Sequence, residues 1–251
     1  MLDPQTISLR LQAASDGTYA RRISRHISPL KGLRGVPTKE IVSILVASWR
    51  SGIRLPRDSD ALNQLFRTAY EDGLVAIGLT AAALPGAPGE ALDLADAWME
   101  VADDLETADA IGWLLLGPGL LATGEPFVEH INELLSEASA IRRRTAVIAL
   151  MATLPTPIEG PAAAALRERV KKRKVAFVED ALDDLLRGVL PRAMKDTDAH
   201  VRKATARVMR TWAISSPDAV EALMAAQSGG INRFIREETE KGLRKGRRKQ
   251  R

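Results

Sequence analysis

The chain has 251 residues, of which 45% are hydrophobic and 27% charged, and this composition supports a folded domain with a substantial apolar core. It contains no cysteine, which excludes disulfides, thiolate metal sites and cysteine nucleophiles. The formal net charge is +4 and no apolar run is long enough to span a bilayer, so we predict a cytoplasmic protein that does not enter membranes.

Apolar residues recur at three- and four-residue spacing from Thr38 through Leu243, whereas the alternation typical of strands is almost absent. Thr38, which follows Pro37, is placed to cap a helix over 39–50. Further helices of similar size follow, with breaks at 52, 56, 85–89, 117–119, 155–161, 215–217 and 229–230. This layout predicts an all-α fold, in which antiparallel helical hairpins stack into a single solenoid domain over residues 1–251.

Two segments are expected to depart from this stack. Residues 155–174 begin with prolines and end in a basic run, which indicates a linker or an inserted loop. Residues 244–251 form a basic tail that we expect to be disordered, and such a tail adds salt-sensitive, non-specific affinity for DNA.

Charged residues are segregated along the chain. Basic residues cluster at 21–25, 142–144, 167–174, 202–210 and 244–251, whereas acidic residues dominate 90–106 and 179–184. Segregation of this kind indicates one basic face, and basic faces most often meet phosphate. The alternative is a set of solvated helix surfaces with a frayed tail.

The helix that opens at Val201 carries three cations on one face. Val201 begins an apolar stripe, and on the opposite side Lys203, Arg207 and Arg210 follow one another at four- and three-residue steps without an acid. Like charges at these spacings cost a few tenths of a kcal/mol each, roughly, so stability alone does not favour them. The arrangement suits a polyanion, while a solvated outer face remains the alternative unless this face is concave.

A second basic helix start is formed by Arg142, Arg143 and Arg144. Arginines in a first turn oppose the helix dipole, which favours a bound anion beside them. Arg144 shares a flank with Ile148 and Met151, so its stem is expected to be partly buried and its guanidinium fixed for a phosphate contact.

One carboxylate occupies an unexpected place. Asp109 shares a helix face with Gly112, Trp113 and Leu116. An acid on a largely apolar face is paired, caps a helix, or has a catalytic function. The residues alone leave these three readings open.

Metal and organic cofactors are not expected. The three histidines, at 26, 130 and 200, have no ligand partners at metal spacing. Aromatic residues make up only 4% of the chain and fall mostly at positions typical of a core, which disfavours stacking on single-stranded bases.

The same residues carry a family resemblance over nearly the whole chain. The motifs, in order, are Gly35-Val36-Pro37, 66–71 leading into 73–84, 107–111 ending at Gly117, Arg144-Thr145-Ala146, 201–204, and Arg236-Glu237-Glu238 before Leu243. Their order and spacing resemble the AlkD-type DNA alkylation repair proteins. The resemblance implies a HEAT-like solenoid with a concave basic face that binds duplex DNA. Members of that family include DNA glycosylases that remove cationic N3- and N7-alkylated purines without a metal or an organic cofactor.

The resemblance also implies roles for individual residues. Asp109 matches the catalytic aspartate, Arg144 an arginine beside it at the DNA backbone, and Arg210 a basic residue of the DNA-facing surface. The two tryptophans that frame the lesion in active members fall at Leu105 and Arg207, so neither is retained.

This departure matters for the chemistry. Alkylation makes the purine a cationic leaving group, and the bond to the sugar breaks with oxocarbenium character that a carboxylate such as Asp109 can stabilise. Aromatic faces attract a cationic base, whereas Arg207 would repel it. For Trp113 we expect a core position.

Three functions therefore remain open, and the sequence does not decide whether the protein is an enzyme. It is an alkylpurine DNA glycosylase, a catalytically silent DNA-binding protein, or a protein-binding scaffold. In the first, Asp109 is catalytic and duplex DNA is the partner of a monomer. The residues predicted to bind DNA are Arg142, Arg143, Arg144, Lys203, Arg207 and Arg210.

Overall fold

A computed structural model describes residues 2–24, 32–50, 52–55, 57–154, 179–227 and 230–249. All regular secondary structure in these residues is helical, which confirms that the fold is all-α. The elements are α1 (Pro4–Ala13), α2 (Gly17–Ile23), α3 (Thr38–Arg50), α4 (Ser59–Thr68), α5 (Tyr70–Ala83), η1 (Leu84–Gly86), α6 (Pro88–Val101), α7 (Leu105–Ile111), η2 (Gly112–Leu116), α8 (Gly117–Thr123), α9 (Glu125–Leu134), α10 (Ala140–Ala149), η3 (Leu150–Thr153), α12 (Glu179–Ala193), α13 (Ala199–Ser215), α14 (Pro217–Ala226) and α15 (Arg233–Lys249). The loop or insertion expected over 155–174 lies outside the described residues.

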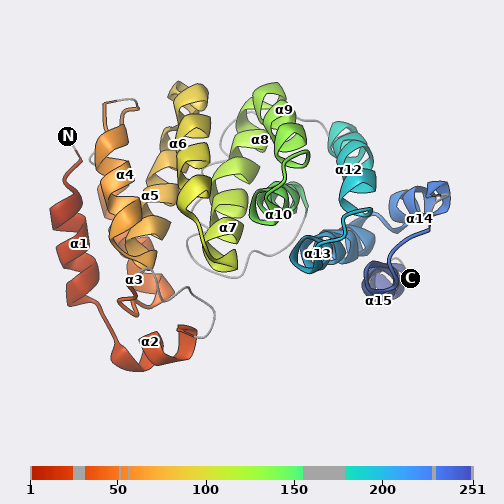
Figure 1. Cartoon of the computed structure of the whole chain (residues 1–251), viewed down its shortest axis with the longest axis horizontal. Helices are drawn as coiled ribbons and strands as arrows, with labels where there is room; N and C mark the ends of the chain where they lie inside the picture. The colour runs from red at the N-terminus through yellow and green to blue at the C-terminus, as the bar shows by residue number, and fades with distance from the viewer. Residues whose placement is uncertain are drawn as a thin grey trace.

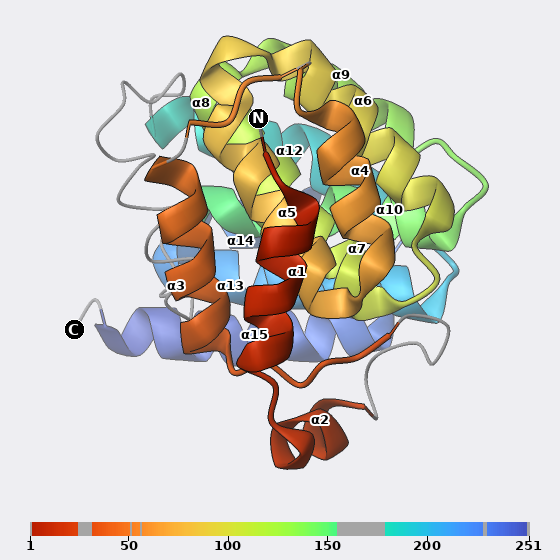
Figure 2. The same ribbon diagram turned by 90° about the vertical axis from the view of Figure 1, so that its left-hand side faces the viewer.

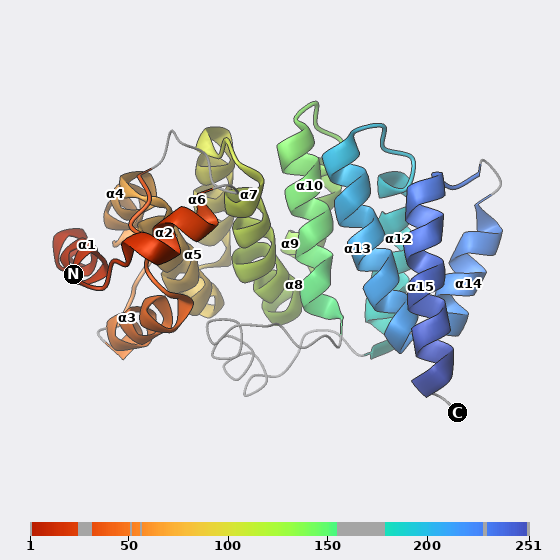
Figure 3. The same ribbon diagram turned by 90° about the horizontal axis from the view of Figure 1, so that it is seen from below.

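The helices follow one another along the long axis of the molecule, from α1 at one end to α14 and α15 at the other (Figure 1). From α6 onward they form two layers. The upper layer contains α6, α9, α12 and α14, and the lower layer contains α7, α10, α13 and α15. Seen from below, the four helices of the lower layer lie in chain order across one face (Figure 3). The view along the long axis separates α6 and α9 at the top from α15 and α2 at the bottom (Figure 2).

The apolar core runs between these layers. Its largest fully buried side chains include Trp98, Trp212, Phe66 and Phe127. The rings of Phe66 and Trp98 stack with centroids 4.7 Å apart, which ties α4 to α6. Of the helices described here, none has the length and low charge needed to cross a bilayer.

Gly112 allows η2 to approach α10 closely. A Cβ atom at this position would lie 2.5 Å from the carbonyl oxygen of Thr145, so even one methyl group would force backbone apart. We expect Gly112→Ala to lower the free energy of unfolding by about 1–3 kcal/mol in chemical denaturation. Gly89→Ala is the matched control, because a Cβ at Gly89 has no neighbour within 4 Å. Equal stability of the two variants would contradict the tight approach.

The basic C-terminal segment is ordered where we expected disorder. Residues 244–249 are the last turns of α15. Gly246 is buried against the carbonyl oxygen of Ala213, and Arg247 pairs with Asp218 at 2.6 Å and with Glu221 at 2.8 Å. Packing on α13 and two carboxylates of α14 therefore hold this segment, and neither interaction is local in sequence.

Candidate functional site

Asp109 lies in the middle of α7 and does not cap it. The cap is Asp104, whose Oδ1 accepts a hydrogen bond from the backbone N–H of Thr107 at 2.7 Å. Its Oδ2 accepts a second one from the Thr107 hydroxyl at 2.8 Å. The capping interpretation of Asp109 is therefore wrong, and its carboxylate is available for another partner.

That partner is Arg144. Its Nε donates to Oδ1 of Asp109 at 2.7 Å and its Nη2 donates to Oδ2 at 2.8 Å, a bidentate ion pair between α7 and α10. The side chains are only 11% and 15% exposed, respectively. Nη1 of Arg144 donates to the carbonyl oxygen of His200 at 2.7 Å, at the start of α13. Arg144 thus joins three helices of the lower layer, and Asp109 keeps lone pairs for a further hydrogen bond.

The segment after Asp109 is a turn of π-helix, η2, a geometry that often marks functional positions. Trp113 in this turn is half-buried and packs against the apolar core, so it lies at the edge of the core where we expected a core position. The Cζ of Arg207 from α13 lies 5.0 Å from the centre of the Trp113 ring, a cation–π contact. The indole Nε1 of Trp113 is buried and has no hydrogen-bond partner among the described residues. One face of this aromatic ring is therefore occupied by a cation of the protein itself.

Lys203, Arg207 and Arg210 of α13 are exposed but differ in their partners. Nη1 of Arg210 pairs with Oε2 of Glu238 in α15 at 2.8 Å. Lys203 and Arg207 have no ion pair with any described residue. Figure 3 shows α13 between α10 and α15 on the lower layer. From α13, Arg207 reaches Trp113 of η2 and Arg210 reaches Glu238 of α15.

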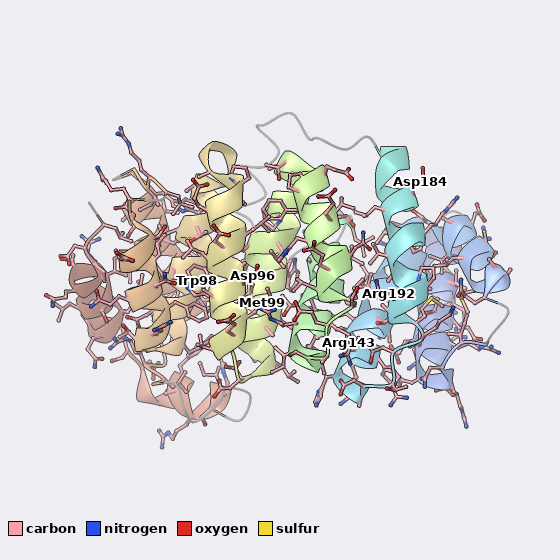
Figure 4. All side chains as sticks on the ribbon, turned by 45° about the horizontal axis from the view of Figure 1, so that its top comes forward. Asp96, Trp98, Met99, Arg143, Asp184 and Arg192 are labelled. Carbon is pink, nitrogen blue, oxygen red and sulfur yellow. The ribbon has the colours of Figure 1, made fainter. Side chains whose placement is uncertain are left out.

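Arg142 and Arg143 point away from Asp109. Nη1 of Arg142 donates to both carboxylate oxygens of Glu137 at 2.8 Å, and its Nη2 lies 3.7 Å from Asp96 of α6. Although burial lowers the pKa of Arg142, these carboxylates raise it overall. Arg143 donates to Asp196 at 2.6 Å, and this bond raises its pKa. Figure 4 labels Asp96 on α6 and Arg143 near the turn into α13, and they occupy different parts of the molecule.

All three arginines that open α10 are therefore paired with carboxylates of the protein. The unfavourable charge at this helix start is balanced internally, and a bound anion is not needed to explain it. The structure joins Asp109 to Arg144, and Arg207 to Trp113, the residue one turn after Asp109. Arg142 and Arg143 pair with other carboxylates.

The cap of α13 supports the backbone that Arg144 binds. Oδ1 of Asp198 accepts hydrogen bonds from the N–H groups of His200 at 2.7 Å and Val201 at 3.1 Å. Burial raises the pKa of Asp198, but these two bonds outweigh burial and lower it from its usual value of 3.8. Because the folded-state pKa is depressed, the stabilisation is complete above pH about 4 and disappears as pH falls through the folded-state value.

We expect Asp198→Ala to lower the free energy of unfolding by about 0.5–2 kcal/mol at pH 7 and by clearly less near pH 3. Thermal unfolding at both pH values measures the difference. Ser139→Ala removes an uncharged cap, the acceptor for the N–H of Arg142 at 3.4 Å, and its effect should not change with pH. A cost of Asp198→Ala that is the same at both pH values would contradict the assignment.

The family model for DNA alkylation repair enzymes matches residues 7–243. The chain belongs to the DNA alkylation repair enzyme family. No curated protein matches the sequence.

In this family member, sequence reasoning missed the pairing of Arg144 with Asp109 and the contact of Arg207 with Trp113. The first pair is separated by 35 residues in sequence, and the second joins η2 to α13. A signal existed for the cap, because aspartate, here Asp104, is among the residues preferred at the N-cap of a helix. In the part of the chain that the structure describes, no group of three or more histidine, aspartate or glutamate side chains is placed to hold a metal ion.

Proposed function

We propose that this protein binds duplex DNA across its lower layer and hydrolyses the N-glycosidic bond of cationic N3- or N7-alkylated purines. The observation that supports this proposal best is the carboxylate of Asp109, both oxygens of which accept hydrogen bonds from Arg144. Arg144 also binds the start of α13, the helix that carries the exposed cations. Membership of a DNA alkylation repair family supports DNA as the substrate. We also propose that the hairpins form a HEAT-like solenoid, with the lower layer as its concave basic face. In Figure 1, α10 lies higher in the view than α2 at one end of the molecule and α15 at the other, which supports this curvature.

In the proposed reaction the bond between C1′ of the sugar and the purine nitrogen breaks. The electron pair of that bond stays with the purine and neutralises the charge that alkylation placed on it. The sugar acquires oxocarbenium character, which the Asp109 carboxylate stabilises. Water adds to C1′ and loses its proton to solvent or to the carboxylate. Arg144 does not touch the reacting atoms in this scheme; it is a positioning residue that fixes the carboxylate.

Lys203, Arg207 and Arg210 are proposed to hold DNA phosphates, since they are exposed on α13. Arg144 is proposed to contribute to the same backbone contact, although its three donating nitrogens already have protein partners. Arg142 and Arg143 were predicted to bind DNA as well. Their ion pairs with Glu137 and Asp196 favour a structural role instead.

A second function is favoured by one observation. Arg207 covers a face of Trp113, and a guanidinium at this place repels a cationic purine that approaches the ring. A family member with such a contact could bind DNA without cleaving it. The protein-binding scaffold, the action as a monomer and the cytoplasmic location are predictions from the sequence alone.

DNA binding is tested by titrating a labelled duplex at several salt concentrations. We expect Lys203→Ala to weaken binding and to reduce the slope of log affinity against log salt by about 1. Arg67→Ala, an exposed arginine of α4, is the matched control and should leave the slope unchanged. Binding of methylated duplex DNA with release of free alkylpurine supports the glycosylase, binding without release supports the silent protein, and no binding leaves the scaffold.

A further inference from the structure

A groove opens between the starts of α13 and α15, and Asp109 is not among its lining residues. Its volume is about 410 Å³. The lining residues are Ala199, Arg202 and Lys203 from α13 with Asn232, Arg233, Phe234 and Glu237 at the start of α15. Of these, Lys203 belongs to the proposed duplex surface, and the others have no part in the function proposed above.

The two helices run parallel, so both amino-terminal ends face this groove. Arg210 of α13 pairs with Glu238 of α15, and later in both helices Gly246 of α15 packs on the carbonyl oxygen of Ala213 in α13. Helices of this length carry partial positive charge at their amino-terminal ends. The first N–H groups are already occupied, because Asp198 caps α13 and the Asn232 side chain accepts from the N–H of Phe234 at 3.0 Å. A ligand of this groove would therefore be bound by side chains.

Positive charge exceeds negative charge in the lining. The lining contains three cations, Arg202, Lys203 and Arg233, and one carboxylate, Glu237. Glu237 accepts a hydrogen bond from Nε of Arg233 at 2.7 Å. Neither Arg202 nor Lys203 forms an ion pair within the described ranges. The groove is thus suited to a ligand with more than one negative charge.

The groove also contains an exposed aromatic ring. Phe234 is 45% exposed, and among the described residues only two other large hydrophobic side chains, Leu9 and Val101, are exposed. It lines the groove together with the cations Arg202, Lys203 and Arg233. A flat apolar face beside several cations is the combination by which proteins hold single-stranded nucleic acid, with the base stacked and the phosphates paired.

We propose that this groove binds an unpaired stretch of a DNA strand, with a base stacked on Phe234 and the phosphates held by Arg202, Lys203 and Arg233. In an intact duplex the bases stack on one another, so the groove acts where a strand end, a gap or an extruded nucleotide frees a base. The proposal rests on the proposed function only in taking DNA as the polymer. It revises the expectation that too few aromatic side chains are available for base stacking.

The test is a titration of a labelled single-stranded oligothymidylate, followed by fluorescence anisotropy. We expect Phe234→Ala to weaken binding by at least about fivefold and Phe234→Trp to preserve it, since stacking on any aromatic ring is sequence-tolerant. Leu9→Ala, which truncates an exposed apolar side chain on α1, is the matched control. Thermal unfolding confirms that each variant is folded. Equal binding by Phe234→Ala and Leu9→Ala overturns the proposal.

A charge variant and a competitor make the test independent of Phe234. Arg202→Ala should make the salt dependence of oligothymidylate binding shallower by about 0.7, the value for one phosphate contact on a single strand. Polyglutamate supplies charge without bases, so it should compete poorly. Displacement by polyglutamate as efficient as by the oligonucleotide would mean a general polyanion surface and would also overturn the proposal.

Failure of this proposal and of the proposed function are distinguishable. Phe234→Ala should leave duplex binding and alkylpurine release unchanged, because Phe234 belongs neither to the proposed duplex surface nor to the proposed reaction. If Phe234→Ala does not weaken single-strand binding while duplex binding and release are intact, only the groove proposal is refuted. The absence of duplex binding or of release, with a clear effect of Phe234→Ala on the single strand, removes only the proposed function.

Discussion

Arg144→Ala is expected to lower the free energy of unfolding by about 2–4 kcal/mol, because it leaves the carboxylate of Asp109 largely buried without its partner. It also removes the donor to the carbonyl oxygen of His200, and with it a connection between α10 and α13. The two side chains are not fully buried, so the loss should fall short of that for a completely desolvated pair. Urea denaturation of the purified variant measures it.

A double-mutant cycle provides the control. Removing both charges with Asp109→Ala and Arg144→Ala together should cost less than the sum of the two single changes, because no unpaired charge remains. Single variants that each stay within about 0.5 kcal/mol of the parent protein would show a solvated surface pair, and the site would lose its fixed carboxylate.

Arg207→Ala is expected to increase release of cationic alkylpurines by about 3- to 30-fold. The guanidinium lies 5.0 Å from the centre of the Trp113 ring, and a cation–π contact of this kind is worth about 0.5–2 kcal/mol. Removing it frees the aromatic face for a cationic base and removes a repelling charge. Because Arg207 also contributes to DNA affinity, the release rate must be measured at saturating methylated duplex DNA.

Lys203→Ala is the matched control for this gain. It removes a positive charge from the same face of α13 without touching Trp113, so it should weaken binding and leave the release rate at saturation unchanged. A release rate of Arg207→Ala that equals or falls below that of Lys203→Ala would mean that Arg207 assists the reaction instead of blocking the ring.

The sequence predicted the helices well because helical periodicity is a local signal. The helix starting near Val201 and the apolar stripe with Trp212 both appear in α13, with the cations of this helix exposed on its other side. The prediction of a disordered tail was wrong for residues 244–249. Their partners, which are Asp218, Glu221 and the backbone of α13, are distant in sequence. Local patterns cannot show such partners.

The candidate site was predictable in its residues but not in its pairings. The acid on an apolar face drew attention to Asp109, which the structure shows paired with Arg144, and the partly buried stem expected for Arg144 agrees with its 11% exposure. Sequence reasoning treated the cations at the start of α10 as free for phosphate. The structure pairs each of them, and one partner, Asp196, is 53 residues away. The π-helical turn that exposes Trp113 to Arg207 has no recognised local signal.

The central claim is that Asp109 stabilises the sugar cation, and single-turnover release of free alkylpurine from methylated duplex DNA tests it most directly. The parent protein should release the base, whereas Asp109→Asn should release it at least about 100-fold more slowly while binding the same duplex, since asparagine keeps the shape but not the charge. Circular dichroism confirms that the variant is folded. Equal release rates for the parent protein and Asp109→Asn would contradict the account.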